Sequence, residues 1–312
     1  MENAPLYNDM AEGPNGGSAY WIKASDGIRL RIAYWPGRDK GTILLFPGRT
    51  EFVEKYGRAA TDLCELGYHV LTIDWRGQGL ADRLLSDDPL LGHVEEFSDY
   101  QLDVAAMMQA ADTLGCPRPR YLMAHSMGGC IGLRALQEGL PVKAAAFSAP
   151  MWGMSVAPAL RPFAKPLVKT LTKLGKGDVR APGTDAETYV KIAPFKDNML
   201  TSDADMYAYM QRHAAEHPEL TLSGPTIRWV QQAFAETLAL QNMSPPTYPA
   251  LTFIGGNERI VDTGAIRDLM ANWKRGTLKE APGAEHEIMM ENPKTRALFF
   301  ATADALFFNN SR

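Results

Sequence analysis

The sequence predicts an α/β protein in which a mostly parallel sheet carries helices on both faces and a helical segment is inserted late in the chain. Three observations predict this architecture. Short apolar runs that suit buried strands alternate with helical segments from residue 42 to residue 147. Helical segments and prolines then dominate residues 151–241. A strand-like apolar run returns at residues 250–255.

The elements of the first half follow from local composition. Asp26-Gly27 is a strong tight-turn pair that joins two strands into a hairpin, the first ordered element we expect. Apolar runs such as 42–46 suit strands buried on both faces, and either Ser98 or Asp99 is expected to cap a helix. The expected strands are 19–23, 28–35, 42–46, 68–73, 120–124 and 142–147, and the expected helices are 52–66, 100–114 and 127–138.

The second half completes the sheet. Residues 250–255 and 277–280 are the remaining expected strands, and residues 293–308 form an expected final helix. We therefore expect one α/β core made of residues 1–150 and 242–312. Residues 151–241 are expected to form a helical cap inserted into that core.

Composition limits the classes of partner. The 312 residues are 46% hydrophobic and 22% charged, which is typical of a soluble globular protein. A formal net charge of −4 argues against a nucleic-acid partner. Three cysteines, without metal-ligand spacing, favour a reducing compartment and no metal. Without a signal-peptide layout or an apolar run of about 18 residues, we expect a cytoplasmic protein, at most peripheral on the inner face of the membrane.

Ser126 is the candidate nucleophile. It lies between an expected strand and an expected helix, within Ala124-His125-Ser126-Met127-Gly128-Gly129. A serine on such a sharp turn exposes its hydroxyl at the carboxyl end of a sheet, and small residues two before and two after it permit the turn. The dipole at the amino end of the helix points at the reacting centre.

His286 is the candidate base. It lies in a loop after the last expected strand, where the base falls when the chain order is serine, acid, histidine. The other histidines have other interpretations: His69 is expected to be packed in a strand, His93 to be structural, His125 to point away from the serine, and His213 and His217 to be exposed on one helical face.

The acid that orients the base has two candidates in one loop. Glu258 comes soon after the strand that ends at Gly255, and Asp262 follows four residues later. Glu258 is favoured because a catalytic carboxylate needs a position that the sheet holds in place, whereas Asp262 suits the cap of a helix beginning near Thr263. Asp262 stays open as the alternative.

Two main-chain N–H groups are candidates for the oxyanion hole. The residue after the nucleophile, Met127, supplies the first donor. The second is expected from the loop after an early strand, where Gly48 allows close approach and the Arg49 N–H is the donor.

These motifs occur in one order over about 240 residues. They are Gly48-Arg49-Thr50-Glu51-Phe52, Asp74-Trp75-Arg76-Gly77-Gln78-Gly79, Gly92-His93-Val94 with Asp99-Tyr100, the string around Ser126, Glu258-Arg259-Ile260-Val261-Asp262, and Glu285-His286-Glu287. Together they resemble the α/β-hydrolase branch of bacterial lysophospholipases and monoacylglycerol lipases. The resemblance implies an α/β-hydrolase fold, a Ser126–His286 triad with its acid at Glu258, and no cofactor.

The chain departs from that pattern at three positions. Ala124 replaces the usual first glycine of the elbow, Pro47 stands where many lipases have histidine, and Ala81 stands where serine is common. We expect a serine hydrolase that cleaves a carboxylic ester, in a lysophospholipid or monoacylglycerol, through an acyl-enzyme. The alternatives are an esterase, thioesterase or peptidase with a soluble substrate, and a non-catalytic ligand-binding module.

One cap segment has a pattern that suits a membrane surface. Basic residues recur at four-residue spacing among apolar ones, and a helix is expected from Pro166 to Leu174. The residues in and just before that helix are Arg161, Lys165, Lys169 and Lys173, with Phe163, Leu167, Val168, Leu171 and Leu174. Pro158, Pro162 and Pro166 disfavour a long continuous helix. Peripheral contact with anionic lipid is one interpretation, and an ordinary cap helix with a solvated basic edge is the other. The sequence carries no signal for an oligomeric state.

Overall fold

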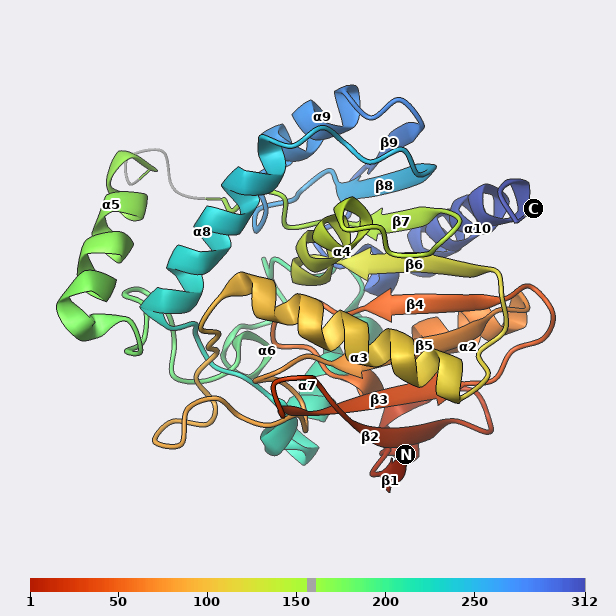
Figure 1. The fold of residues 1–312 in the computed structure, drawn as a ribbon, viewed down its shortest axis with the longest axis horizontal. Helices are drawn as coiled ribbons and strands as arrows, with labels where there is room; N and C mark the ends of the chain where they lie inside the picture. The colour runs from red at the N-terminus through yellow and green to blue at the C-terminus, as the bar shows by residue number, and fades with distance from the viewer. Residues whose placement is uncertain (156–160, 312) are drawn as a thin grey trace.

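A nine-stranded sheet forms the centre of the protein (Figure 1). The computed structural model describes residues 1–155 and 161–311, and only the backbone of residues 161–165. In spatial order the strands are β1 (Glu2–Ala4), β2 (Ser18–Lys23), β3 (Arg29–Trp35), β5 (His69–Asp74), β4 (Thr42–Phe46), β6 (Arg120–His125), β7 (Ala145–Ser148), β8 (Ala250–Gly255) and β9 (Gly276–Ala281). The strands from β5 to β9 are parallel, and β1, β2 and β3 are antiparallel to their neighbours.

Strand β4 is almost entirely apolar because both of its faces are buried. Ile43 and Leu45 join a buried cluster with α2 (Gly57–Glu65) and α10 (Pro293–Asn309). Leu44 and Phe46 join the cluster on the opposite face, with α3 (Tyr100–Thr113) and α4 (Met127–Gln137). Successive strand residues point to opposite faces, so a strand covered on both sides must be apolar at every position. The predicted α/β class with helices on both faces is confirmed.

The amino-terminal segment is more ordered than the sequence predicts. Residues 1–17 contain β1, which pairs with β2, and α1 (Asn8–Ala11). Met10 and Ala11 are buried. These elements are short and depend on contacts with distant parts of the chain, so local periodicity does not reveal them.

Two local expectations need correction. Strand β7 begins at Ala145, not at residue 142, because the preceding Val142 N–H turns back to the Leu140 carbonyl at 2.8 Å. Asp99 belongs to a short 3₁₀ turn, η2 (Phe97–Asp99), that runs into α3. Its side chain accepts from the Glu96 N–H at 3.2 Å, so it caps that turn and not α3.

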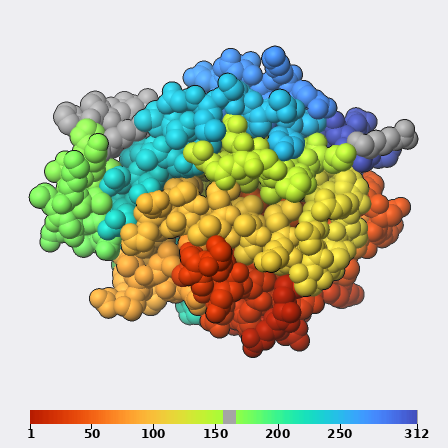
Figure 2. Space-filling view, viewed as in Figure 1, coloured from red at the N-terminus to blue at the C-terminus, as the bar shows by residue number. Residues whose placement is uncertain are grey.

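The segment between β7 and β8 is helical in its described part. It contains α5 (Arg161–Leu171), a π-helical turn η3 (Thr172–Lys176), α6 (Tyr189–Ile192), α7 (Ala204–Glu216), η4 (Pro218–Leu220) and α8 (Ile227–Gln241). These helices lie beyond the carboxyl ends of the parallel strands, and α8 leads back to the core (Figure 1). Figure 2 shows α5 at one extremity of the molecule against α8.

Helix α5 starts earlier than the sequence predicts. Pro166 lies inside it and not at its first position, and the helical path ends in η3, where Gly175 has φ 74°. Part of the basic and apolar pattern expected for this segment lies outside the described residues: Pro158 and the side chains of Arg161, Pro162, Phe163 and Lys165. None of the helices that the structure describes combines the length and apolar character needed to cross a membrane.

Candidate active site

Ser126 occupies a strained turn between β6 and α4. Its φ of 48° and ψ of −117° lie where residues other than glycine are rare. Main-chain hydrogen bonds hold the turn: the Ser126 N–H donates to the Ser148 carbonyl at 3.1 Å, and the Met151 N–H donates to the Ser126 carbonyl at 2.8 Å. This is the backbone geometry of a nucleophile elbow.

The elbow packs directly on the end of β4. A Cβ added at Gly128 would fall on the carbonyl oxygens of Phe46 and Pro47. Ala124, two residues before the serine, is completely buried. The small residues expected around the turn therefore bring the amino end of α4 against the loop that follows β4.

That loop is held on either side of Arg49. The Gly48 N–H donates to the Glu51 carboxylate, and the Thr50 N–H donates to Gln78 Oε1 at 2.8 Å. A Cβ at Gly48 would lie 2.9 Å from that Glu51 carboxylate, so glycine is needed there. The main-chain N–H of Arg49 lies between these two N–H groups, each of which already has an acceptor. The Met127 N–H is at the first position of α4, where a helix offers no internal acceptor.

His286 follows β9 and is 3% exposed. Its Nδ1 lies 2.7 Å from Glu258 Oε2. The other oxygen of Glu258 accepts from the Ile260 N–H at 2.7 Å and the Val261 N–H at 3.1 Å. Burial raises the pKa of Glu258, but the attraction and hydrogen bonds of His286 and the two main-chain donors outweigh it and lower that pKa. The carboxylate is thus held ionised against the imidazole.

Asp262 has a different partner. Its Oδ1 accepts from the Gly264 N–H at 2.9 Å and the Ala265 N–H at 3.3 Å. These bonds cap α9 (Thr263–Ala271), as expected for an aspartate just before a helix. Of the two carboxylates that the sequence left open, Glu258 is the one in contact with His286.

A cavity of about 550 Å³ connects these groups. Ser126, His286 and Arg49 line it on one side. Tyr189, Met210 and Trp229, from the segment between β7 and β8, are among the residues that line it on the other. The volume falls within the range of small-molecule sites. Residues far apart in sequence therefore share one cavity at the carboxyl end of the sheet.

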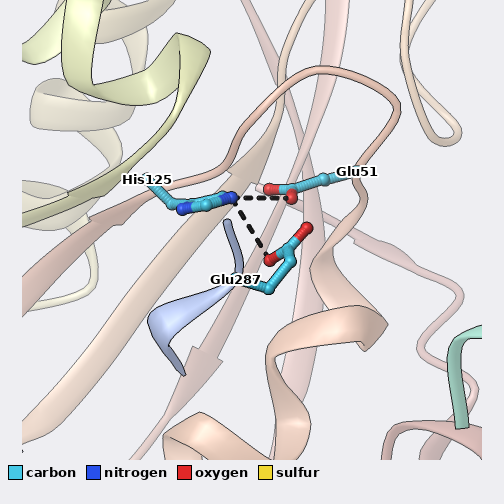
Figure 3. A group of neighbouring side chains, drawn as sticks. All are labelled: Glu51, His125 and Glu287. Carbon is cyan, nitrogen blue, oxygen red and sulfur yellow. Dashed lines mark ion pairs between the residues drawn. The ribbon is translucent and has the colours of Figure 1, made fainter. Parts of the chain in front are cut away.

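A buried charged cluster that forms part of the cavity wall was not predicted (Figure 3). Lys55 Nζ lies 2.5 Å from Glu51 Oε1 and 2.6 Å from Glu287 Oε1. His125 points at both carboxylates, with Nε2 3.2 Å from Glu287 and 3.6 Å from Glu51. Burial lowers the pKa of His125, yet the two glutamates raise it above its ordinary value. The i,i+4 spacing of Glu51 and Lys55 was the available sequence signal.

This cluster supports the site without containing the proposed reacting groups. The His125 and His286 rings are 4.7 Å apart, Glu287 follows His286 in the chain, and Glu51 holds the Gly48 N–H. The cluster therefore joins the loop after β4, the end of β6 and the loop after β9.

The expected exposure of His213 is wrong. It was expected to be exposed beside His217, but it is 1% exposed. Its Nε2 lies 2.8 Å from the Met10 carbonyl, and its ring is 4.0 Å from that of Tyr209. Burial lowers the pKa of His213 to about 4. The amino-terminal segment covers it, which the helical pattern of residues 204–216 does not reveal.

Two groups of possible metal ligands occur among the described residues. One is the buried group Glu51, His125 and Glu287, where the Lys55 ammonium already contacts both carboxylates. The other group comprises His93, Glu95 and Asp178. There, Arg228 Nε lies 3.4 Å from Glu95 and 2.9 Å from Asp178. In each group a side-chain cation of the protein already balances the carboxylates.

The fold and the elbow define an α/β-hydrolase, and comparison with known families agrees. The chain belongs to the hydrolase family described as serine aminopeptidase S33, whose model matches residues 37–293. Within it, the chain is 34% identical over 286 residues to lysophospholipase L2 of Escherichia coli K12, which covers 86% of this chain and 80% of the relative. It is 30% identical over 257 residues to a probable lysophospholipase L2 of Haemophilus influenzae, with coverage of 81% and 79%.

Solved structures share the same fold. A monoglyceride lipase from Saccharomyces cerevisiae matches with a TM-score of 0.72 at 21% identity, over 93% of this chain and 95% of that one. A monoacylglycerol lipase from Paleococcus ferrophilus matches with a TM-score of 0.69 at 20% identity, over 89% and 98%. The α/β-hydrolase fold and the carboxylic ester hydrolase class predicted from the sequence are confirmed.

Proposed function

We propose that this protein hydrolyses the carboxylic ester of a lysophospholipid or monoacylglycerol through an acyl-enzyme. The observation that carries the proposal is the 2.7 Å contact between Glu258 and Nδ1 of His286, a residue that lines the same cavity as Ser126. A serine alcohol needs a base, and the base needs an orienting acid. The lysophospholipase names of the two bacterial relatives support the choice of substrate.

The reaction follows from these roles. Ser126 Oγ attacks the acyl carbonyl while His286 Nε2 takes its proton, and Glu258 holds the ring and stabilises the imidazolium. The Arg49 and Met127 N–H groups bind the oxyanion, where losing one donor costs about 2.7–4 kcal/mol. His286 then returns the proton to the leaving alcohol. A water molecule activated by His286 releases the fatty acid, so no cofactor is needed.

Residues 151–241 act as the cap of this enzyme in our proposal, and residues 1–150 and 242–312 act as its core. Support comes from the position of the insertion, which leaves the sheet after β7 and returns at β8. Its residues supply part of the cavity wall over Ser126. A cap in this position selects the substrate and keeps water from the acyl-enzyme.

A substrate panel tests the proposal. Wild type and Ser126→Ala are assayed with a 1-acyl lysophosphatidylcholine, a 1-acylglycerol, an acyl thioester and an aminoacyl amide. We expect wild type to cleave the two lipid esters fastest and Ser126→Ala to cleave none. Preference for the amide or thioester would overturn the substrate. Absence of fluorophosphonate labelling in folded wild type would instead favour a non-catalytic binding module.

We further propose that the cap contacts the cytoplasmic face of the membrane peripherally. Leu167 is 51% exposed and Leu174 is 69% exposed. Lys169, Lys173 and Lys176 are exposed on the same segment. Apolar side chains flanked by lysines bind anionic lipid surfaces by burial and by charge attraction.

Vesicle co-sedimentation at low salt tests this contact. Lys169→Glu/Lys173→Glu should weaken binding to vesicles containing phosphatidylglycerol at least tenfold, at about 1 kcal/mol for each basic residue. Lys274→Glu/Lys294→Glu makes the same charge change at exposed core positions and should bind more tightly than the cap variant. Equal loss in both variants would show that net charge alone is responsible.

A further inference from the structure

Arg49 carries a half-buried charge that the reaction as proposed does not use. Only its main-chain N–H has a role in that reaction, yet the half-buried side chain lines the same cavity as Ser126. Burial lowers the pKa of Arg49 to about 10, so the side chain still carries its positive charge at neutral pH. A buried cation is costly unless an anion compensates it.

The protein supplies little compensation. Arg49 Nη2 donates to the Ser223 carbonyl at 2.7 Å, and the guanidinium lies 5.3 Å from the centre of the Trp229 ring. Its Nε is buried without a hydrogen-bond partner. Among the described residues, no carboxylate pairs with it: the groups that act on its charge are Tyr100 and Arg180. A guanidinium nevertheless offers five N–H donors.

The surroundings hold this unpaired cation in one place. A Cβ at Gly92 would lie 2.5 Å from Arg49 Nη2, so glycine leaves the room that the guanidinium occupies. Gly92 is bridged to Pro225, and its N–H donates to the Gly224 carbonyl at 3.0 Å. Ser223, Gly224, Pro225 and Trp229 all line the cavity that holds Ser126. The cation is therefore built into one wall of the substrate cavity.

We propose that the Arg49 guanidinium binds the phosphate of a lysophospholipid head group and makes this class of lipid the preferred substrate. The inference rests on the proposed function and names its substrate class. Arg49 reaches both ends of the head group, because its main-chain N–H serves the ester oxyanion while its side chain extends along the cavity wall. Charge-assisted bonds from a guanidinium suit a phosphate, whereas a monoacylglycerol offers no anion.

The test compares two esters with the same acyl chain, a 1-acyl lysophosphatidylcholine and a 1-acylglycerol. Arg49→Gln keeps the main-chain N–H and should lower the ratio of their kcat/KM values tenfold to hundredfold, roughly the worth of one charged hydrogen bond. Arg49→Lys should restore part of the ratio. Arg180→Gln removes a neighbouring cation that already pairs with Asp88 at 3.0 Å, and it should change the ratio less than threefold.

A binding measurement separates this inference from the proposed function. A short alkylphosphocholine, which has no ester and is used below its micelle concentration, should bind wild type at least tenfold more tightly than Arg49→Gln, while an alkyl glycerol ether should bind both equally. An unchanged ratio with unchanged binding would overturn the inference even if both esters are cleaved. Relief of fatty-acid inhibition in Arg49→Gln, without a change of ratio, would assign the cation to the product carboxylate and also overturn it.

Discussion

Glu258 and Asp262 lie four residues apart in one loop, yet they have different environments. Glu258 contacts the buried imidazole of His286 and accepts two main-chain bonds. Asp262 faces the first turn of α9. In the sequence, the position close to the end of a strand favours Glu258 as the acid, but it does not exclude Asp262. The direction of each side chain separates them.

This difference gives a paired prediction. Glu258→Gln should lower kcat by about 10³–10⁴ with little change in KM, because a neutral amide no longer fixes the tautomer or stabilises the imidazolium. Asp262→Asn makes the same chemical change at the N-cap of α9, where Asn caps a helix as well as Asp does. This variant should keep activity within about twofold. Steady-state kinetics of both variants decide, and a large loss in Asp262→Asn would point to the other carboxylate.

Lys55 is the central residue of the buried charged cluster. Lys55→Met would leave Glu51 and Glu287 without their shared cation, and breaking a buried ion pair costs about 3–5 kcal/mol. Lys40→Met removes a partly exposed pair with Asp304, 2.7 Å long, and should cost about 1 kcal/mol or less. Urea unfolding at pH 7 measures both. Equal losses would mean that the cluster has no special role in stability.

The contact between α4 and the end of β4 places the Ser126 turn beside the loop that carries Arg49. Helix α4 approaches so closely because Gly128 has no side chain. Its neighbour on the next turn, Gly132, is less confined, since a Cβ there would meet the flexible end of Leu122 at 2.9 Å. The geometry of the site therefore depends on how these two elements dock, and not on the serine turn alone.

Alanine substitutions test this docking. Gly128→Ala should destabilise the protein by about 3 kcal/mol or more and reduce activity, because its Cβ meets main-chain atoms that cannot move aside. Gly132→Ala should change stability by about 1 kcal/mol or less, since Leu122 can rotate and alanine favours a helix. Urea unfolding with activity assays on both proteins measures the difference. A tolerated Gly128→Ala would show that α4 can shift without loss of the site.

At the scale of the whole molecule, the amino-terminal segment joins α7 to α2, two helices that lie far apart in the chain. The Tyr209 hydroxyl of α7 lies within hydrogen-bond distance of the carbonyl oxygens of Ala11 and Glu54, at 2.7 and 3.0 Å. Glu12 pairs with Arg58 of α2 at 2.7 Å and also with Arg212 of α7. The segment that the sequence left without structure therefore links an inserted helix to a core helix.

His213, which contacts the amino-terminal segment, should make the stability of the folded protein fall at acidic pH. Its pKa is lowered to about 4 by burial, below the usual value of about 6.5 in an unfolded chain. Between pH 6.5 and 4 the unfolded state binds the extra proton, so stability falls as the pH falls through this window. From pH 7 to pH 5 the loss from this residue is about 2 kcal/mol.

Urea unfolding at pH 7 and pH 5 checks this expectation. Wild type should lose about 2 kcal/mol more than His213→Gln, whose amide can still donate to the Met10 carbonyl but does not titrate. Comparing the change with pH, and not the absolute stability, removes the packing effect of the substitution. Identical pH dependence in the two proteins would contradict a lowered pKa at His213.

The sequence by itself determined the α/β class, the order of the core strands and helices, and the strand–serine–helix turn. Those features depend on residues close together in the chain, whose periodicity and turn preferences are local. The tertiary structure decided which carboxylate meets His286, that His213 is buried, and that Arg49 is left with an unpaired charge. Each of these depends on side chains from segments far apart in sequence, and their contacts exist only after those segments have packed together.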